Sequence, residues 1–110
     1  MNTMSKVIKQ AIATLREDPA VDAAYNNQHD IVRMAKLLRT WRTGANKTQA
    51  DLAAAMGTSQ STISRLESFD NAHMPQIETV REWAHKCGRN LYIGGEPDGV
   101  PVEPEKMLIL

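Results

Sequence analysis

The sequence predicts a mainly α-helical protein that ends in a short β-strand. Apolar residues recur at helical spacing in several stretches between Val7 and Cys87. One pair of these stretches is joined at Gly57, with helix-capping residues nearby, which is the pattern of two short helices around a tight turn. Only Leu91 to Ile93 has strand character, and the glycines and prolines after it interrupt regular structure. A chain of 110 residues is expected to form one small domain with an appended segment.

The first two helices are expected before residue 30. The first carries an apolar stripe that includes Val7, Ile8, Ala11, Ile12 and Leu15. Asp18-Pro19 then starts a second short helix, because proline suits the first turn of a helix. This second helix carries Val21, Ala24 and Tyr25, and Asn26-Asn27 is expected to break it.

A longer helix is expected from near Asp30 to about Gly44. Its inward face, which is available to cover the two short helices, consists of Ile31, Met34, Ala35, Leu38 and Trp41. Asn46 suits a left-handed exit from this helix. We expect Trp41, like Trp83 further along, to be a partly buried packing residue.

The two short helices have clear start and stop signals. Thr48 is expected to cap the first, and Asp51, three residues on, completes a capping box. Gly57 ends this helix in a left-handed turn, and Ser59 caps a second helix that runs to about Glu67. The inward residues of the two helices are Leu52, Ala53, Met56, Ile63 and Leu66.

The outward face of the second short helix carries Gln60, Ser61, Ser64 and Arg65. Glutamine pairs with adenine and arginine with guanine through two hydrogen bonds, each pair being worth about 1–3 kcal/mol of discrimination. Short hydroxyl side chains also let the backbone approach a phosphate closely. The pattern therefore predicts that these four residues read DNA bases in the major groove. The alternative is a solvated polar helix.

Charge is balanced overall but unevenly distributed. Lys plus Arg and Asp plus Glu each number 13. Between residues 33 and 65, Asp51 is the only acid among six bases, namely Arg33, Lys36, Arg39, Arg42, Lys47 and Arg65. The tail is acidic, since only Lys106 opposes Glu96, Asp98, Glu103 and Glu105. A basic zone of this kind fits phosphate neutralisation on one face and predicts an affinity that falls steeply with salt.

A last helix is expected from Pro75 through Cys87, where Gly88 ends it. Its inward face is expected to be Ile77, Val80, Ala84 and Cys87. The strand formed by Leu91, Tyr92 and Ile93 would be alone, and a lone strand leaves its backbone edges unsatisfied. We therefore predict that it pairs with the same strand of a second subunit, giving a homodimer that binds a palindromic site. The role of Met107 to Leu110 stays open among disorder, strand pairing and covering an exposed patch.

These residues resemble the lambda-repressor-like (XRE/Cro-type) helix-turn-helix family over roughly residues 30 to 88. The resemblance rests on Arg42, Thr48-Gln49, Leu52-Ala53, Gly57 and the run from Ser59 to Glu67. One departure is Asn46-Lys47, where the family commonly has a glycine and a leucine.

The resemblance implies a five-helix domain that binds double-stranded DNA. Within it, Gln49 and the hydroxyl of Ser59 or Thr62 would grip phosphate, and Lys47 and Arg39 are further candidates for phosphate contact. It also implies that Arg42 pairs with Glu67, the alternative being two solvated charges of little consequence.

A narrower resemblance uses the flanks. The segments from Asp18 to Tyr25 and from Gly88 to Ile93 are similar to HigA-type antitoxins of type II toxin–antitoxin modules. This implies an antitoxin that neutralises a RelE/HigB-like RNase toxin and represses its own operon. The residues expected to bind the toxin are Val7, Ile8, Ile12 and Leu15. Packing of this stripe on its own domain, a second dimer contact, and a phage-type or stand-alone regulator without a toxin remain alternatives.

The expected organisation is an N-terminal helical extension (1–29), a helix-turn-helix domain (30–90) and a strand with a C-terminal tail (91–110). No catalytic residue, cofactor or metal is expected, because His29, His73 and His85 lack the spacing of a metal site and no nucleophile has a histidine and an acid at a suggestive spacing. Cys87 is interpreted as a small buried hydrophobe. With no apolar run of membrane-spanning length and no apolar signal-peptide core near Met1, the expected location is the cytoplasm.

Overall fold

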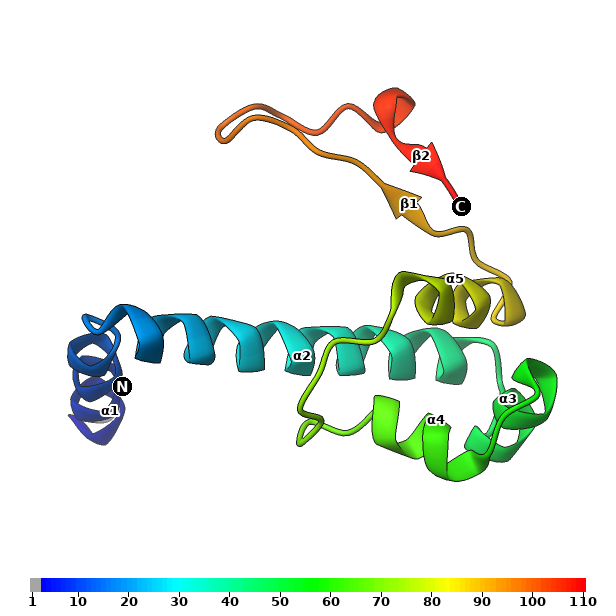
Figure 1. Ribbon diagram of the computed structural model, residues 1–110, viewed down its shortest axis with the longest axis horizontal. Helices are drawn as coiled ribbons and strands as arrows, with labels where there is room; N and C mark the ends of the chain where they lie inside the picture. The colour runs from blue at the N-terminus through cyan, green and yellow to red at the C-terminus, as the bar shows by residue number, and fades with distance from the viewer. Residues whose placement is uncertain (1–2) are drawn as a thin grey trace.

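The computed structural model describes residues 3–110 and is mainly α-helical, as the sequence predicts. Five α-helices are present in this part of the chain: α1 (Thr3–Leu15), α2 (Pro19–Gly44), α3 (Gln49–Met56), α4 (Gln60–Leu66) and α5 (Ile77–Lys86). They are followed by the two-residue strands β1 (Tyr92–Ile93) and β2 (Leu108–Ile109), with the short 3-10 helix η1 (Pro104–Lys106) between them. Figure 1 shows α4 and α5 on opposite sides of the C-terminal half of α2, with α3 beyond its end.

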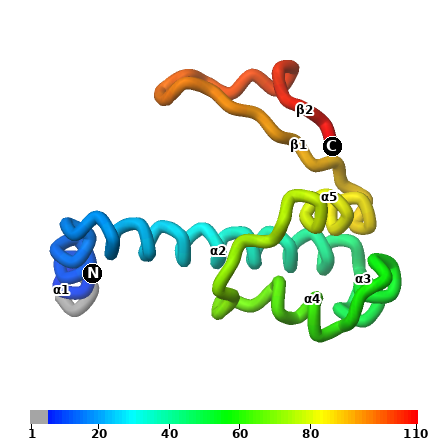
Figure 2. The backbone as a smooth tube through the Cα atoms, in the orientation of Figure 1, coloured from blue at the N-terminus to red at the C-terminus, as the bar shows by residue number. Residues whose placement is uncertain are grey.

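The helix α2 is continuous, so the predicted break at Asn26-Asn27 is wrong. Asparagine in a helix costs only a fraction of a kcal/mol relative to alanine, roughly 0.7 at most, and helix propagation from a well-packed segment outweighs it. The packed segment is the second half of α2, where Ile31, Ala35 and Leu38 are buried. The expected boundary between residues 29 and 30 therefore lies inside one straight helix (Figure 2).

The corner between α1 and α2 is held by polar contacts of Arg16. Its guanidinium forms an ion pair with Asp22 and donates a hydrogen bond to Asn26 Oδ1 at 2.9 Å. The same guanidinium lies 4.5 Å from the centre of the Tyr25 ring. Asp18 caps α2 by accepting from the Ala20 amide, as the Asp18-Pro19 pair predicts. These contacts fix the direction in which α1 leaves the end of α2.

The hydrophobic core lies where α2, α3, α4 and α5 meet. Its fully buried members include one large side chain from each helix, namely Leu38, Leu52, Ile63 and Trp83. The indole N–H of Trp83 donates to the Leu38 carbonyl at 3.0 Å, which satisfies the one polar atom of that ring. Trp41 is half-buried against this core, as expected, whereas Trp83, which was also expected to be partly buried, is fully buried.

The prediction of the inward face of α5 is wrong at one residue, Ile77. Ile77 is half exposed, whereas Val80, Ala84 and Cys87 are buried as predicted. Ile77 is the first residue of α5. The buried face of this helix consists of Val80, Trp83 and Ala84. Burial in this apolar setting raises the pKa of the Cys87 thiol, which is the behaviour of an inert packing residue.

The strand β1 is not alone, so the premise of the predicted pairing between subunits is wrong. β1 pairs with β2 of the same chain in antiparallel register, with Tyr92 opposite Ile109 and Ile93 opposite Leu108. The Leu110 amide also donates to the Leu91 carbonyl at 2.8 Å. The C-terminal Met107 to Leu110 segment thus satisfies one edge of β1, which is one of the three roles left open for it.

None of the helices that the structure describes combines the length and the apolar character needed to cross a membrane.

Candidate nucleic-acid interface

The start of α3 is set by a reciprocal pair of hydrogen bonds, as predicted. The Asp51 amide donates to Thr48 Oγ1 at 3.0 Å, and the Thr48 amide donates to Asp51 Oδ2 at 2.9 Å. The chain reaches this cap through Asn46, whose φ of 56° is the left-handed exit expected of it. The hydrogen bond from the Thr48 backbone amide holds the pKa of the Asp51 carboxyl below its usual value.

This cap predicts an acid-sensitive contribution to stability. The pKa of Asp51 is lowered on folding, so its contribution is present above the unfolded pKa and is lost as the pH falls through the folded pKa. Asp51→Asn is expected to lower the melting temperature at neutral pH, with the deficit shrinking below about pH 4. Thermal unfolding followed by circular dichroism from neutral to acidic pH measures it. Asp70→Asn, an exposed acid outside the cap, is the control; equal deficits at all pH values for Asp51→Asn would contradict the prediction.

The turn between α3 and α4 places the second helix. Gly57 has φ of 66°, the left-handed conformation predicted for it. Ser59 then caps α4 by accepting from the Thr62 amide at 3.1 Å. The hydroxyls of Ser59 and Thr62 lie 2.9 Å apart, so one donates to the other. One hydroxyl hydrogen of this pair is left to donate to a phosphate oxygen.

The four residues predicted to read bases lie together on the exposed side of α4. Gln60, Ser61, Ser64 and Arg65 are all exposed, and they line one open depression. Gln49, from the first turn of α3, lines the same depression. The arrangement places side chains suited to base edges beside one suited to a phosphate on a single concave surface.

The loop after α4 forms the remaining wall of this depression, which sequence reasoning did not anticipate. Ser68, Asp70, Asn71 and Ala72 line it together with the α4 residues. The loop folds back because the Asp70 amide donates to Ser68 Oγ at 3.2 Å. Ser68 is the signal that was available for this turn, because a serine hydroxyl can accept from the backbone amide two residues further on.

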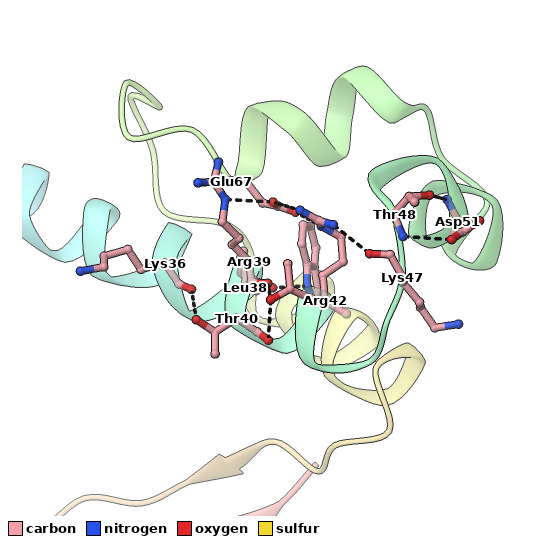
Figure 3. Close-up of polar contacts among 11 residues, drawn as sticks. Lys36, Leu38, Arg39, Thr40, Arg42, Lys47, Thr48, Asp51 and Glu67 are labelled. Atoms are coloured by element: carbon pink, nitrogen blue, oxygen red, sulfur yellow. Dashed lines mark hydrogen bonds and ion pairs between the residues drawn. The ribbon is translucent and has the colours of Figure 1, made fainter.

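Arg42 and Glu67 form the predicted pair, and it is bidentate (Figure 3). Arg42 Nε donates to Glu67 Oε2 at 2.6 Å, and Arg42 Nη2 donates to Glu67 Oε1 at 2.9 Å. The Glu67 carboxylate is fully buried and the Arg42 side chain is 12% exposed. The hydrogen bonds to Glu67 raise the pKa of Arg42, so the guanidinium keeps its charge. It joins α2 to the C-terminal end of α4.

Arg42 also positions the loop before α3. Its Nη1 donates to the Lys47 carbonyl at 2.8 Å. Figure 3 shows the Lys47 side chain leaving this carbonyl in the direction away from the pair with Glu67. One guanidinium therefore connects α2, the loop before α3 and the end of α4, which fixes the two short helices relative to each other.

Lys47 and Arg39, the other residues predicted to contact phosphate, differ in how far other contacts restrain their side chains. The Lys47 side chain is half-buried but makes no ion pair within residues 3–110. Arg39 is partly engaged, since its Nε lies 3.5 Å from Glu67 Oε1 and its guanidinium 6.0 Å from the centre of the Phe69 ring. Its side chain is still 55% exposed, which leaves it able to turn toward a phosphate.

Within the described part of the chain, no group of three or more His, Cys, Asp or Glu side chains is arranged to hold a metal ion. Comparison with known proteins gives one result: the sequence profile of a helix-turn-helix family matches residues 38–93, slightly more than half of the chain. No curated protein and no solved structure matches the chain.

Proposed function

Because the chain belongs to the lambda-repressor-like helix-turn-helix family and is thus a DNA-binding transcriptional regulator, we propose that it is a sequence-specific repressor. In this proposal α4 lies in the major groove and reads an operator. The observation that carries the proposal is the open depression lined by Gln49 and by the four exposed polar side chains of α4. Those residues come from two helices whose relative position is held by the buried Arg42–Glu67 pair.

The chemistry of the depression suggests a division of roles. Gln60 suits adenine and Arg65 suits guanine, while Ser61 and Ser64 can donate to or accept from either kind of base edge. Gln49 and the Ser59–Thr62 hydroxyl pair would contact phosphate, with Lys47 and Arg39 adding positive charge.

Selection from a random duplex library tests the proposal directly. The purified chain is expected to enrich one short sequence and to bind it at least about a thousandfold more tightly than unrelated DNA of equal length. Repression of a reporter through the enriched sequence would then follow. A library that shows no enrichment after repeated rounds would leave α4 as a solvated polar helix and would contradict the proposal.

Lys47→Ala separates phosphate contact from base reading. The variant is expected to bind the selected duplex and unrelated duplexes more weakly by similar factors, because a phosphate contact carries no sequence information. The slope of log affinity against log salt should fall in magnitude by about 1. Titration by fluorescence anisotropy at several salt concentrations measures both. Lys86→Ala removes a lysine from α5, away from the depression, and should change neither quantity; an unchanged slope for Lys47→Ala would remove this residue from the interface.

The proposal includes a homodimer on a palindromic operator. The seven-residue helix α4 offers four reading side chains, and two copies spaced one duplex turn apart would double the site that is read. Leu91, Tyr92 and Ile93 remain candidates for the contact between copies, because a two-stranded sheet leaves one edge of each strand free.

A second candidate function is that of an antitoxin, and the exposure of the α1 stripe favours it. Val7, Ile8 and Leu15 are each more than half exposed, while Ile12 is partly buried. An amphipathic helix of this kind can lie in an apolar groove of a RelE/HigB-like RNase toxin. The alternative is a phage-type or stand-alone regulator without a toxin.

The neighbouring reading frame decides between these two functions. Its product, if small and basic, is expected to copurify with this chain and to lose its RNase activity in the complex. Ile8→Asp should abolish copurification, whereas Leu37→Asp, at an exposed apolar residue of α2, should not. A neighbouring frame that encodes no such protein, or a complex that is unaffected by Ile8→Asp, would contradict toxin binding through α1.

A further inference from the structure

We propose that Gln28 positions the loop after α4, residues 68–72, and thereby couples the order of the N-terminal arm to DNA binding. The arm consists of α1 and of the residues of α2 up to Asn27. The inference rests on the proposed function, because this loop forms one wall of the depression in which α4 is proposed to read DNA. It gives the first half of α2 a role in DNA binding that needs no contact with DNA.

The loop is attached to α2 through one peptide group, which joins Phe69 to Asp70. The carbonyl oxygen of this group, on Phe69, accepts a hydrogen bond from Gln28 Nε2 at 2.7 Å. Its amide, on Asp70, donates to Ser68 Oγ at 3.2 Å. Because a peptide group is planar, fixing its oxygen and its nitrogen fixes the orientation of the whole group. The direction in which the chain enters Asp70 is therefore set by Gln28 and Ser68 together.

The ring of Phe69 makes a second contact with α2. The Arg39 guanidinium lies 6.0 Å from the centre of this ring, within the range of a cation–π interaction. Ser68 and Asp70, on either side of Phe69, both line the depression. Figure 1 shows the chain after α4 passing the middle of α2 before it reaches α5. The loop thus contacts α2 through Phe69 and faces the depression through the residues on both sides of it.

The position of this loop affects DNA binding because of the charge on Asp70. Among the described residues that line the depression, Asp70 carries the only negative charge and Arg65 the only positive charge. A carboxylate can accept a hydrogen bond from cytosine in the major groove, but it repels a phosphate. A loop that is already ordered keeps the carboxylate in one place. A released loop would have to be ordered when DNA binds, which lowers the affinity.

Gln28 in turn depends on the arm for its own position. Its side chain is exposed, and the first buried residue of α2, Ile31, comes three residues later. In an α-helix the amide of residue 28 donates to the carbonyl of residue 24, so the preceding turn holds Gln28 in place. If the arm unfolds up to Asn27, Gln28 falls in the first turn of the remaining helix, where amides lack helical partners and the end frays. Loss of order in the arm therefore loosens the loop.

The coupling acts in both directions. If an ordered arm raises the DNA affinity by some factor, bound DNA favours the ordered arm by the same factor. The net contribution of one hydrogen bond corresponds to a factor of about two to ten. DNA bound at α4 is thus expected to slow the hydrogen exchange of the amides of residues 22–27, although these residues do not line the depression.

Gln28→Met tests the inference in the full-length protein. Methionine matches glutamine in length and helix propensity, but it cannot donate a hydrogen bond to the Phe69 carbonyl. In the free variant, NMR relaxation should give lower backbone order parameters for Asp70 and Asn71, with those of α4 unchanged. The affinity for the duplex selected by the wild type should fall by about twofold to tenfold in anisotropy titrations. The protection that this duplex gives to the amides of residues 22–27 should be lost in the variant.

A matched control and a folding check keep the test specific. Gln10→Met makes the same chemical change at an exposed residue of α1 and should alter none of these quantities. Because Gln28 is exposed as well, Gln28→Met should keep the melting temperature of the wild type.

Three results with Gln28→Met would each overturn the inference: unchanged order parameters in the loop, unchanged affinity for the selected duplex, or protection of residues 22–27 by the duplex that persists. A wild type that selects no duplex would overturn the reading role of α4 and the coupling with it. The order parameters of the loop are measured without DNA, so failure of the Gln28 contact and failure of the proposed function remain distinguishable.

Discussion

Arg42→Ala is expected to lower the free energy of unfolding by about 3–5 kcal/mol, because it leaves a buried carboxylate without its partner. The Glu67 carboxylate is fully buried and accepts two hydrogen bonds from Arg42. The variant also frees the Lys47 carbonyl, which loses its hydrogen bond from the same guanidinium. Arg39, at 3.5 Å and more than half exposed, is too far from ideal geometry to replace it. Urea unfolding monitored by the fluorescence of Trp83 and Trp41 measures the loss.

Two variants distinguish the effect of losing the buried Arg42–Glu67 pair from the effect of losing a nearby exposed charge. Arg39→Ala removes the more exposed arginine and should cost less than about 1 kcal/mol. Arg42→Met combined with Glu67→Leu replaces both charges by apolar side chains of similar volume and should recover most of the stability lost by Arg42→Ala. A loss below about 1 kcal/mol for Arg42→Ala would mean that water reaches Glu67, which would contradict its full burial.

Gln60→Ala and Arg65→Ala are each expected to weaken binding to the selected operator by roughly tenfold to a hundredfold. Each removes a side chain that suits bidentate pairing with one base, so the loss should be confined to duplexes that carry the preferred base. Binding of Gln60→Ala to unrelated DNA should be nearly unchanged. Because both side chains are exposed, neither variant should lower the melting temperature. Anisotropy titrations with the selected duplex and with its single-base variants measure the pattern.

Arg89→Ala provides the control, because it removes an exposed arginine after the C-terminus of α5 and outside the depression. It should leave base preference intact. If Gln60→Ala and Arg65→Ala both bound the selected duplex as the wild type does, α4 would not be the reading helix, and the function proposed for the depression would have to be abandoned.

The features that the sequence predicted well are those decided within a few residues. The capping box at Thr48 and Asp51, the left-handed turn at Gly57 and the cap at Ser59 each depend on one side chain and the nearest backbone amides. The exposed face of α4 follows from helical periodicity around Ile63. The pair between Arg42 and Glu67 is distant in sequence, and it was predicted through resemblance to a family.

The features that the sequence did not predict depend on contacts between distant segments. The local sequence Asn26-Asn27 predicts the end of a helix. The helix nevertheless continues through these residues, because it propagates from the buried second half of α2. The partner of β1 lies fifteen or more residues further along, beyond several glycines and prolines, so local pattern could not identify it. The contribution of the loop at Asp70 to the depression likewise depends on how the chain folds back after α4.

Because α2 is continuous and only its second half is buried, its first half can unfold while the core stays folded. None of its first twelve residues has a buried side chain. The first buried residue of the helix is Ile31. Amides before that point are therefore protected from hydrogen exchange by helix propagation from the core, by the Arg16 corner and by the hydrogen bond that Gln28 Nε2 donates to the Phe69 carbonyl at 2.7 Å. Opening at Asn26-Asn27 would release α1 on a flexible tether while the core around Trp83 stayed folded. The arm that carries α1, up to Asn27, is thus the segment whose order can be gained or lost while the core stays folded.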